Sequence, residues 1–565
     1  MEAVRFFDSP DAVKQVRGVL DDGGFTLDAL TERLGPHAFA HIVAGEIAPL
    51  ERATRGGDAL DTLLRLFVIG VPVPRSAAQA ALSPLPVDVF TTGGVLVTDD
   101  DDVGSLLALR PLGGPEHWVL AHDPAPTRGR TIAPDHVLGV SASTMALAGA
   151  TIRRPIAAAF DLGTGCGVQA LYASSHSERV VASDLNERAV AVSNLTMELN
   201  GISRVSVRSG DLFEPVAGDR FDLVVANPPF VISPSRQYLF RDAGEPLDEL
   251  CRSIVRSVPG HLSDGGHCQL LASWAHVQGE HWNDRLASWF DGTGCDALVL
   301  VRETLDPSAH AASWLRQTEA SDRWAPLYDD WMTYYERHGI EAIGLGLITM
   351  RKRDDGHAWF RTEEAAQDFA MPCGDHLGAA FELADYVDAH PGDRLADAVL
   401  RVAPDVVLDE RAQAVPGGWA LTSSVLRQTA GLCREGEIDD AMAAIVAACD
   451  GTTPLGAVLR DAAHAADAGG VEARAWCAPR DSPSRRARIP ASRHGMNPAF
   501  PPNLLEARGR AVCRHLATGT RKESQVHERR WLGGWSARGG SDTRRRVEGL
   551  SRRHAGSVRS RSRHR

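Results

Sequence analysis

Short apolar runs alternate with longer amphipathic stretches between residues 136 and 354. Such alternation predicts a mostly parallel β-sheet covered by helices on both faces, so we expect an α/β domain here. One helix is expected over residues 187–200, with Asn186 as its N-cap and Gly201 as its stop. The predicted strands are residues 157–162, 179–184, 205–211, 221–226, 268–273, 297–302 and 340–350.

The composition excludes several other classes of protein. The chain has 565 residues, of which 44% are hydrophobic and 24% are charged, which is typical of a globular protein with several domains. It has no stretch of about 18 uncharged apolar residues and no signal-peptide pattern, so neither a membrane span nor secretion is expected. Nine cysteines are scattered without CxxC spacing. We therefore expect a reduced, cytoplasmic protein with no metal and no membrane partner.

Acidic and basic residues are divided unevenly along the chain. The full chain has a formal net charge of -13, but residues 481–565 contain 21 basic and 6 acidic residues, which leaves -28 for residues 1–480. The Arg-rich tail has little apolar periodicity and is predicted to be disordered. Two interpretations of it stay open: an arm that binds nucleic acid phosphates, or the product of a shifted reading frame, which we favour.

Residues 1–112 predict a small helical domain that ends in a hairpin. Thr26 is a candidate N-cap for a helix that Gly35 ends. Two strand-like runs, at 94–98 and 106–112, are joined by four aspartates. Helices followed by a hairpin suggest a winged-helix-like domain, which either docks a substrate or nucleic acid or serves as a structural cap. The acidic hairpin tip disfavours DNA binding because it repels phosphates.

The remaining flanking segments carry no motif with evident chemistry. Residues 113–135 are rich in proline and glycine and are predicted to form a linker. Residues 355–480 are predicted to form a small C-terminal domain, mainly helical and also winged-helix-like. The elements expected in it are a strand at 419–426, helices at 438–449 and 454–466, and a turn at 450–453.

Residues 314–335 are unusually aromatic, with three of the twelve tryptophans and three of the six tyrosines. Two interpretations stay open. The segment is either a lid that stacks on a planar substrate, with Trp324 and Trp331 as its main residues, or a packed insertion before the last strand. We favour the packed insertion.

A glycine-rich turn follows the first predicted strand, in the run Phe-Asp-Leu-Gly-Thr-Gly-Cys-Gly-Val at 160–168. Its glycines allow the backbone to approach a bound nucleotide, and the helix that follows offers free N–H groups. Asp184 ends the next strand, where a carboxylate can accept hydrogen bonds from both ribose hydroxyls. The alternatives are an ordinary strand–helix turn and an aspartate that caps a helix.

A third motif, Gly210-Asp211-Leu212, follows the third predicted strand. Asp211 lies where it is able to contact an adenine amino group. The alternative is a carboxylate on a surface turn.

The fourth motif is Asn227-Pro228-Pro229-Phe230, directly after a buried apolar strand. Two prolines there cannot donate ladder hydrogen bonds, so they predict a rigid turn at the carboxyl edge of the sheet, where ligands bind in such folds. Asn227 supplies an amide oxygen, the neighbouring backbone carbonyl supplies a second acceptor, and Phe230 supplies a flat face. Together they suit a planar NH2 group whose nitrogen lone pair is aimed at an electrophile.

With these four motifs in order, residues 136–354 resemble a class I S-adenosylmethionine-dependent methyltransferase. The resemblance is to the small methyltransferase group, which includes the HemK-type glutamine methyltransferases and the amino-group nucleic-acid methyltransferases. It covers about 220 of the 565 residues and implies a Rossmann-like sheet of seven strands, S-adenosylmethionine as cofactor and no metal. The upstream residues Ser143 and Thr144 fall where relatives complete the cofactor pocket.

The resemblance also implies a role for each motif residue. Asp184 and Leu185 would hold the ribose, and Asp211 and Leu212 would flank the adenine. The loop around the methionine part of the cofactor would consist of Asp161, Gly163, Thr164, Gly165 and Gly167.

Four further residues are implied to form the acceptor clamp. Asn227 would bind the acceptor nitrogen and border the cofactor, assisted by Pro228 and Pro229, and Phe230 would pack on the acceptor. The HemK-type pattern has Tyr where this chain has Phe230. Phe occurs there in guanine-N2 rRNA enzymes, where His commonly follows, but here Val231 follows.

Four functions are weighed on this basis. The favoured one is N-methylation of a glutamine amide in a translation factor, because residues 238–254 resemble the segment that follows the motif in HemK-type enzymes. The alternative is methylation of the exocyclic amine of a base in rRNA, tRNA or DNA, with the base flipped out onto Phe230. A non-catalytic cofactor-binding regulator and a nicotinamide oxidoreductase both leave the Asn227 motif unexplained.

Overall fold

The structure is a computed structural model that describes residues 5–114, 117–124, 132–319, 321–353, 358–365 and 369–465. All of these residues belong to one compact unit. The Arg-rich tail at 481–565 lies outside the described residues, so the prediction of disorder is not addressed. No helix in the described ranges is long and apolar enough to cross a membrane.

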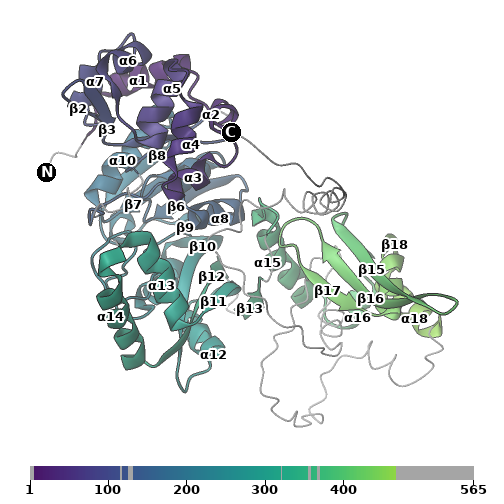
Figure 1. The fold of residues 1–565 in the computed structure, drawn as a ribbon. Coiled ribbons are helices and arrows are strands. Elements are labelled where there is room, and N and C mark those ends of the chain that lie inside the picture. The colour runs from purple at the N-terminus through teal and green to yellow at the C-terminus, as the bar shows by residue number, and fades with distance from the viewer. Residues whose placement is uncertain are drawn as a thin grey trace, which may run out of the picture. The chain divides into compact units, whose positions relative to one another are not determined.

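The centre of the fold is an eight-stranded sheet (Figure 1), with the strand order β13-β11-β12-β10-β9-β6-β7-β8. β12 runs antiparallel to both of its neighbours, and the other pairs in the sheet are parallel. All seven predicted strands are confirmed, and β13 adds an edge strand. The strands are β6 (Ile156–Leu162), β7 (Ser177–Asp184), β8 (Val205–Ser209), β9 (Phe221–Ala226), β10 (Leu262–Val277), β11 (Cys295–Leu305), β12 (Ile340–Lys352) and β13 (Phe360–Glu364).

The strand order fixes where a ligand binds. The chain runs outward from β6 through β7 to β8, then returns to place β9 on the other side of β6. In open α/β sheets, the carboxyl ends of the strands at such a reversal form the binding crevice. The predicted Rossmann-like class is therefore confirmed, and the crevice lies where β6 and β9 end.

Helices cover both faces of the sheet because successive strand residues point in opposite directions. Ala159 and Val225 pack with α9 and α10, whereas Phe160 and Val224 pack with α11 on the opposite face. The predicted helix at 187–200 is confirmed as α10, capped by Asn186. The helices of this part are α8 (Ala142–Ala150), α9 (Val168–Ala173), α10 (Glu187–Leu199), α11 (Glu249–Ser257), α12 (Trp282–Ala287), α13 (Pro307–Thr318) and α14 (Trp324–Arg337), with 3-10 turns at Glu214–Val216, Val258–His261, Ser288–Phe290 and Ser321–Arg323.

The N-terminal residues form helices and short strands, as expected. Thr26 accepts a hydrogen bond from the Ala29 N–H, so the predicted cap is confirmed, and Gly35 follows the helix with φ +85°. The helices are α1 (Pro10–Asp22), α2 (Leu27–Leu34), α3 (Ala38–Ala44), α4 (Ile47–Ala53), α5 (Ala59–Leu63), α6 (Arg75–Ala81) and α7 (Val87–Thr92), with a π-helical turn at Leu64–Ile69.

The predicted pairing of residues 94–98 with 106–112 is wrong. β2 (Leu96–Asp99) pairs with β3 (Asp102–Ser105), because the aspartates themselves form a tight turn at Asp100, which has φ +51°. β3 also pairs with β1 (Val73–Pro74). Residues 106–112 contain β4 (Ala108–Pro111), which pairs with β5 (Val119–His122) inside the predicted linker.

The C-terminal region contains strands as well as helices, so it is not the mainly helical module that was expected. The strand at 419–426 and the helices at 438–449 and 454–466 are found, but the expected turn at 450–453 is a strand that pairs with β14, where two β-branched threonines favour extended backbone. The elements are α15 (Gly374–Ala389), α16 (Asp393–Ala396), β14 (Val399–Arg401), β15 (Val406–Val415), β16 (Gly418–Gln428), β17 (Glu435–Ile438), α17 (Asp440–Ala448), β18 (Asp450–Pro454) and α18 (Leu455–Ala465).

The aromatic segment forms α13 and α14, between β11 and β12. Trp331 and Tyr335 are each 1% exposed and pack with Ile340 and Ile343 of β12. The packed-insertion interpretation is therefore correct for these two side chains, and Trp331 is not available to stack on a substrate.

Candidate active site

The glycine-rich turn is held in place by Asp161, the buried carboxylate near the end of β6. Asp161 Oδ2 accepts hydrogen bonds from the Thr164 hydroxyl at 2.6 Å and the Ala170 N–H at 3.0 Å. Burial raises the pKa of Asp161 to about 7. Gly167 has φ +86°, and a Cβ there would lie 2.6 Å from Ser193 Oγ, so only glycine fits without a shift.

Asp184 lies beside this turn, at the carboxyl end of β7. Its Oδ2 accepts from the Gly165 N–H at 2.8 Å, and its Oδ1 accepts from the Asn186 N–H at 2.9 Å. Burial raises the pKa of Asp184. Asn186 caps α10, so Asp184 is free of that role. Next to it, the Leu185 side chain is 61% exposed and gives this edge an apolar surface.

The turn after β8 is joined to the same edge, because the Gly210 N–H donates to the Asp184 carbonyl at 3.1 Å. Asp211 is exposed, and its carboxylate makes no hydrogen bond within the described part of the chain. Leu212 is half-buried and has φ +44°, which non-glycine residues rarely adopt. The turn therefore offers one carboxylate and one apolar side chain beside Asp184.

The Asn-Pro-Pro-Phe turn follows β9, which pairs with both β6 and β10. Asn227 is half-buried, and its amide makes no hydrogen bond to any described residue. Pro228 is buried, whereas Pro229 and Phe230 are half-buried. The Ser273 hydroxyl of β10 donates to the Phe230 carbonyl, which fixes the end of the turn.

Sequence reasoning missed the residues that hold the segment after this turn. Asp242 accepts hydrogen bonds from the Gln237 and Tyr238 N–H groups at 2.9 and 3.0 Å and pairs with the Arg241 guanidinium at 2.7 Å. Hydrogen bonds from Arg241 keep the pKa of Asp242 below its ordinary value even though burial opposes this. Arg241 is 2% exposed, and its position between Phe240 and Asp242 in the sequence gives no signal that its side chain is buried.

A second missed feature is the segment before α8, which was expected to be a plain linker. The Pro134 carbonyl accepts from the Leu239 N–H at 3.1 Å, and the Asp135 carbonyl accepts from the Asn186 side chain at 2.8 Å. This segment therefore joins the edge that carries Asp184 to the segment after Phe230. Thr144, suggested from the sequence, is buried in α8, and its carbonyl accepts from the Gln169 side chain at 2.8 Å.

Trp314 of α13 contacts Phe230, the residue expected to pack on the methyl acceptor. Its ring lies 6.5 Å from the Phe230 ring, centroid to centroid, in a T-shaped arrangement. Of the six aromatic residues singled out at 314–335, Trp314 is therefore the one that borders the Asn227 turn.

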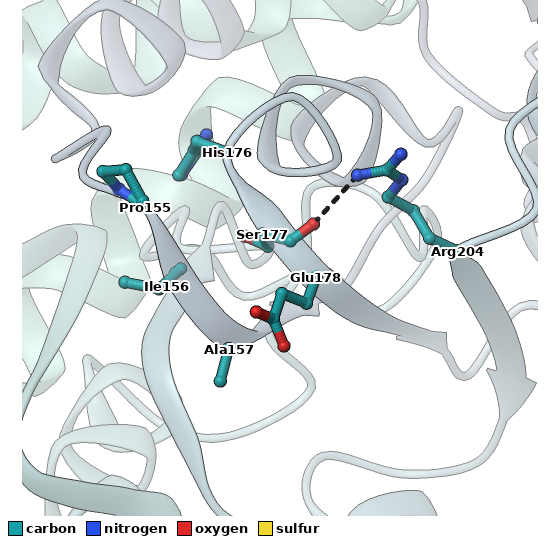
Figure 2. Close-up of a pocket in the computed structure, with 7 residues that line it drawn as sticks. All are labelled: Pro155, Ile156, Ala157, His176, Ser177, Glu178 and Arg204. Carbon is teal, nitrogen blue, oxygen red and sulfur yellow. Dashed lines mark hydrogen bonds between the residues drawn. The ribbon is translucent and has the colours of Figure 1, made fainter.

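An open hollow of about 390 Å³ lies away from these residues, at the amino ends of β6 and β7 (Figure 2). Because the motif residues follow the carboxyl ends of the strands, this hollow is not the motif site. The Arg204 guanidinium donates to the Ser177 carbonyl at 3.5 Å. The hollow is lined by Pro155, Ile156, Ala157, His176, Ser177, Glu178 and Arg204.

The residues at the carboxyl edge suit an adenosine group linked to an amino acid. A Cβ at Gly163 or Gly165 would meet nothing within 4 Å, so the outer side of the turn is open. Asp184 and Asp211 offer acceptors for hydroxyl and amino groups, and each carboxylate has about four acceptor positions. The neighbouring leucines offer apolar surface for a base. No group of three metal-ligating side chains occurs among the described residues.

Comparison with protein families identifies three stretches of the chain. Residues 142–281 match the Methyltransferase small domain. Residues 22–106 and 379–478 each match a domain of unknown function, DUF7059 and DUF7782 respectively.

Three curated relatives share the central stretch. A release factor glutamine methyltransferase of Xylella fastidiosa is 31% identical over 127 residues, which is 20% of this chain and 46% of the relative. A ribosomal RNA small subunit methyltransferase C of Alcanivorax borkumensis is 31% identical over 113 residues, covering 20% and 31%. A ribosomal protein uL3 glutamine methyltransferase of Bradyrhizobium diazoefficiens is 34% identical over 135 residues, covering 21% and 42%. The chain thus spans less than half the length of each.

Solved structures align weakly. A methyltransferase from Pyrococcus furiosus has 14% identity and a TM-score of 0.25, covering 41% of this chain and 89% of that one. The M. jannaschii tRNA m1G37 methyltransferase has 12% identity and a TM-score of 0.26, covering 44% and 58%. The fold assignment rests on the strand order of the sheet.

Proposed function

We propose that this chain methylates a nitrogen atom of a macromolecule. The proposal starts from the match of residues 142–281 to the Methyltransferase small domain. The observation that carries the proposal is the Asn227 amide, which has no partner among the described residues and follows β9 beside the Asp161 turn. A protein that only bound the cofactor would have no use for a free amide and a half-buried ring at that position.

S-adenosylmethionine would supply the methyl group, activated by its positively charged sulfur. The turn at 163–167 would surround the methionine part, and Asp184 with Leu185 would hold the ribose. Asp211 and Leu212 would flank the adenine. These residues fit because their carboxylates and apolar side chains lie along one edge of the sheet, joined by the hydrogen bonds from Gly165 and Gly210.

Asn227 would orient the acceptor. An amide or an aromatic amine is a poor nucleophile because its lone pair is delocalised. Hydrogen bonds from its N–H groups to the Asn227 side chain and the Pro228 carbonyl would favour a pyramidal nitrogen with a localised lone pair. Phe230 would pack on the flat acceptor, and the Ser273 hydroxyl would hold the Phe230 backbone. Positioning of this kind supplies much of the rate in group transfer.

The favoured acceptor is the side-chain amide of a glutamine in a protein of the translation machinery. Relatives named for glutamine methylation, of a release factor and of ribosomal protein uL3, match the central stretch at 31% and 34% identity, as closely as the relative named for ribosomal RNA at 31%. The net charge of -28 over residues 1–480 also disfavours a nucleic-acid substrate, because it repels the phosphate backbone.

A nucleobase amine is the second candidate, and two observations favour it. One relative is named for methylation of ribosomal RNA. Trp314 lies edge-on to Phe230, so the acceptor position has a second aromatic wall of the kind that receives a flipped base.

The experiment that separates the two uses methyl-labelled S-adenosylmethionine and an extract from cells that lack the gene. Parallel samples are digested with nuclease or with protease after incubation with the full-length protein. Label that resists nuclease and is lost to protease identifies a protein acceptor. Label lost to nuclease alone identifies a nucleobase and refutes the glutamine assignment.

A further inference from the structure

The C-terminal region contains a two-stranded ribbon that extends beyond its sheet (Figure 1). β15 and β16 pair from Val406↔Gln428 to Val415↔Gly418. β17 pairs only with residues 424–427 of β16. Residues 407–423, which we name the β15–β16 ribbon, therefore have no third strand along most of their length within the described chain.

Large apolar side chains are concentrated on this ribbon. Twelve are exposed in the described chain, and five of them lie between Val407 and Leu421. Trp419 is 75% exposed and Leu421 is 47% exposed. An exposed cluster of this kind marks an interaction site more often than a bare surface, since tryptophan is a frequent anchor residue of interfaces.

The strand register places two of these side chains, Trp419 and Leu421, on one face, whereas Val415 points to the other. Ala414 lies opposite Trp419, and Ala412 lies opposite Leu421. Because side chains two apart on a strand point to the same side, these four residues form one apolar strip near the hairpin turn. An apolar side chain of a partner protein would be able to pack against this strip.

The outer edge of β15 is open along its whole length. No described strand pairs with that edge, and nine of its ten residues are exposed. An open edge presents backbone N–H and C=O groups that pair readily with an additional extended chain. The occupant favoured by this geometry is therefore a polypeptide in extended conformation.

Charge indicates which polypeptide fits. The three strands and their turns, residues 406–438, contain four acidic and three basic side chains, and Asp405 and Asp439 border them at the two ends. The Arg427 guanidinium already pairs with Asp409 at 2.9 Å and with Glu435 at 2.7 Å, and Arg434 pairs with Glu363 at 2.6 Å. The acidic excess favours a basic partner and disfavours the phosphates of RNA.

We propose that the β15–β16 ribbon binds an extended, basic segment of a partner protein. The segment would add a strand to β15 and place an apolar side chain against Trp419. This binding does not depend on methyl transfer. If the proposed function also holds, the ribbon gives a protein acceptor a docking site on the same chain.

The test measures binding of a defined peptide to the full-length protein without cofactor. The probe is a fluorescein-labelled ten-residue peptide of alternating lysine and N-methylvaline, which is able to pair along one edge only. A glutamate version and a twelve-nucleotide poly(U) RNA are the matched probes. We expect the lysine peptide to bind, and Trp419→Ala to weaken its binding at least tenfold. Val399→Ala is the control, because Val399 is 50% exposed on β14 outside the ribbon.

Three results would overturn the proposal. The first is equal binding of the lysine and glutamate peptides, or equal binding by the wild type and Trp419→Ala. The second is tighter binding of poly(U) that Trp419→Ala abolishes, which would make the ribbon a nucleic-acid platform. The third is self-association in sedimentation experiments that Trp419→Ala removes, because the occupant would then be a second copy of the chain.

Discussion

Replacing Asp161 with asparagine tests the electrostatics of the glycine-rich turn. An aspartate ionises near pH 3.8 when the chain is unfolded, whereas burial raises the pKa of Asp161 to about 7 in the folded chain. Between these values the folded state holds a proton that the unfolded state has lost. The free energy of unfolding contributed by this group therefore falls as the pH rises through this window and is constant above it.

The size of the effect follows from the shift. A displacement of about 3 pH units at about 1.4 kcal/mol per unit corresponds to about 4 kcal/mol. Asparagine resembles the protonated acid, and its oxygen is able to accept the hydrogen bonds that Thr164 and Ala170 donate to Asp161 Oδ2. We therefore expect Asp161→Asn to match the wild type near pH 4 and to exceed its stability by about 4 kcal/mol at pH 8.

Urea unfolding followed by tryptophan fluorescence at pH 4, 6, 7 and 8 measures this difference. The stability of the variant relative to the wild type should increase with pH and level off above pH 7. A constant difference across the range would refute the buried, protonated carboxyl group. A difference of the opposite sign would mean that the turn stabilises the ionised form.

Three further changes have expected outcomes. Gly167→Ala should lower the free energy of unfolding by more than the ~1–2 kcal/mol cost of φ +86°, because the added Cβ also meets Ser193 Oγ. Gly279→Ala is the control, since Gly279 has φ +83° and a Cβ there would meet nothing within 4 Å. Equal losses for the two variants in urea unfolding would contradict the steric effect of Ser193. Asp184→Ala should weaken S-adenosylmethionine binding by about 1–3 kcal/mol in calorimetry, and undiminished affinity would exclude Asp184 from the cofactor site. Asp242→Ala should cost about 1–3 kcal/mol of stability, because it removes the nearer carboxylate from the buried Arg241 and leaves it Glu319 at 3.6 Å and the Thr318 hydroxyl at 2.6 Å; a loss below 1 kcal/mol in urea unfolding would show that these two partners suffice.

The parts of the site that depend on residues close together in the sequence were predicted correctly. The turn at 163–167 and the cap at Asn186 depend on residues within a few positions of each other, so glycine spacing and capping preferences suffice. The seven strands were found for the same reason, since each is a short apolar run between helical segments. Five of the seven were predicted too short, most clearly β10, whereas β9 matches its prediction and β8 ends two residues earlier than predicted.

Contacts between distant residues were not predictable in this way. Ser273 donates to the Phe230 carbonyl across 43 positions, and the Tyr335 hydroxyl donates to the Ile232 carbonyl at 3.0 Å across 103 positions. Neither serine nor tyrosine in an apolar run signals such a role. The aromatic segment shows the same limit, because composition alone did not separate buried Trp331 from Trp314, which borders Phe230.

Strand pairing near the N-terminus failed for a related reason. Four consecutive aspartates read as a loop tip, yet Asp99 and Asp102 are themselves paired at the ends of β2 and β3. The run at 106–112 then pairs with β5, a strand inside a segment whose proline and glycine content predicted a linker. The composition of these segments indicated their polarity but not the strands with which they pair.

The role of Asn227 is tested most directly by comparing methyl transfer with cofactor affinity in Asn227→Ala. Transfer of labelled methyl to an extract from cells that lack the gene is measured beside S-adenosylmethionine binding by calorimetry. Asn194→Ala serves as the control, because Asn194 is half-buried on α10, away from the motif turn. We predict that Asn227→Ala binds the cofactor nearly as the wild type does and loses at least 99% of transfer, while the control retains both. Normal transfer by Asn227→Ala, or no transfer by the wild type, would contradict the proposed methyltransferase mechanism.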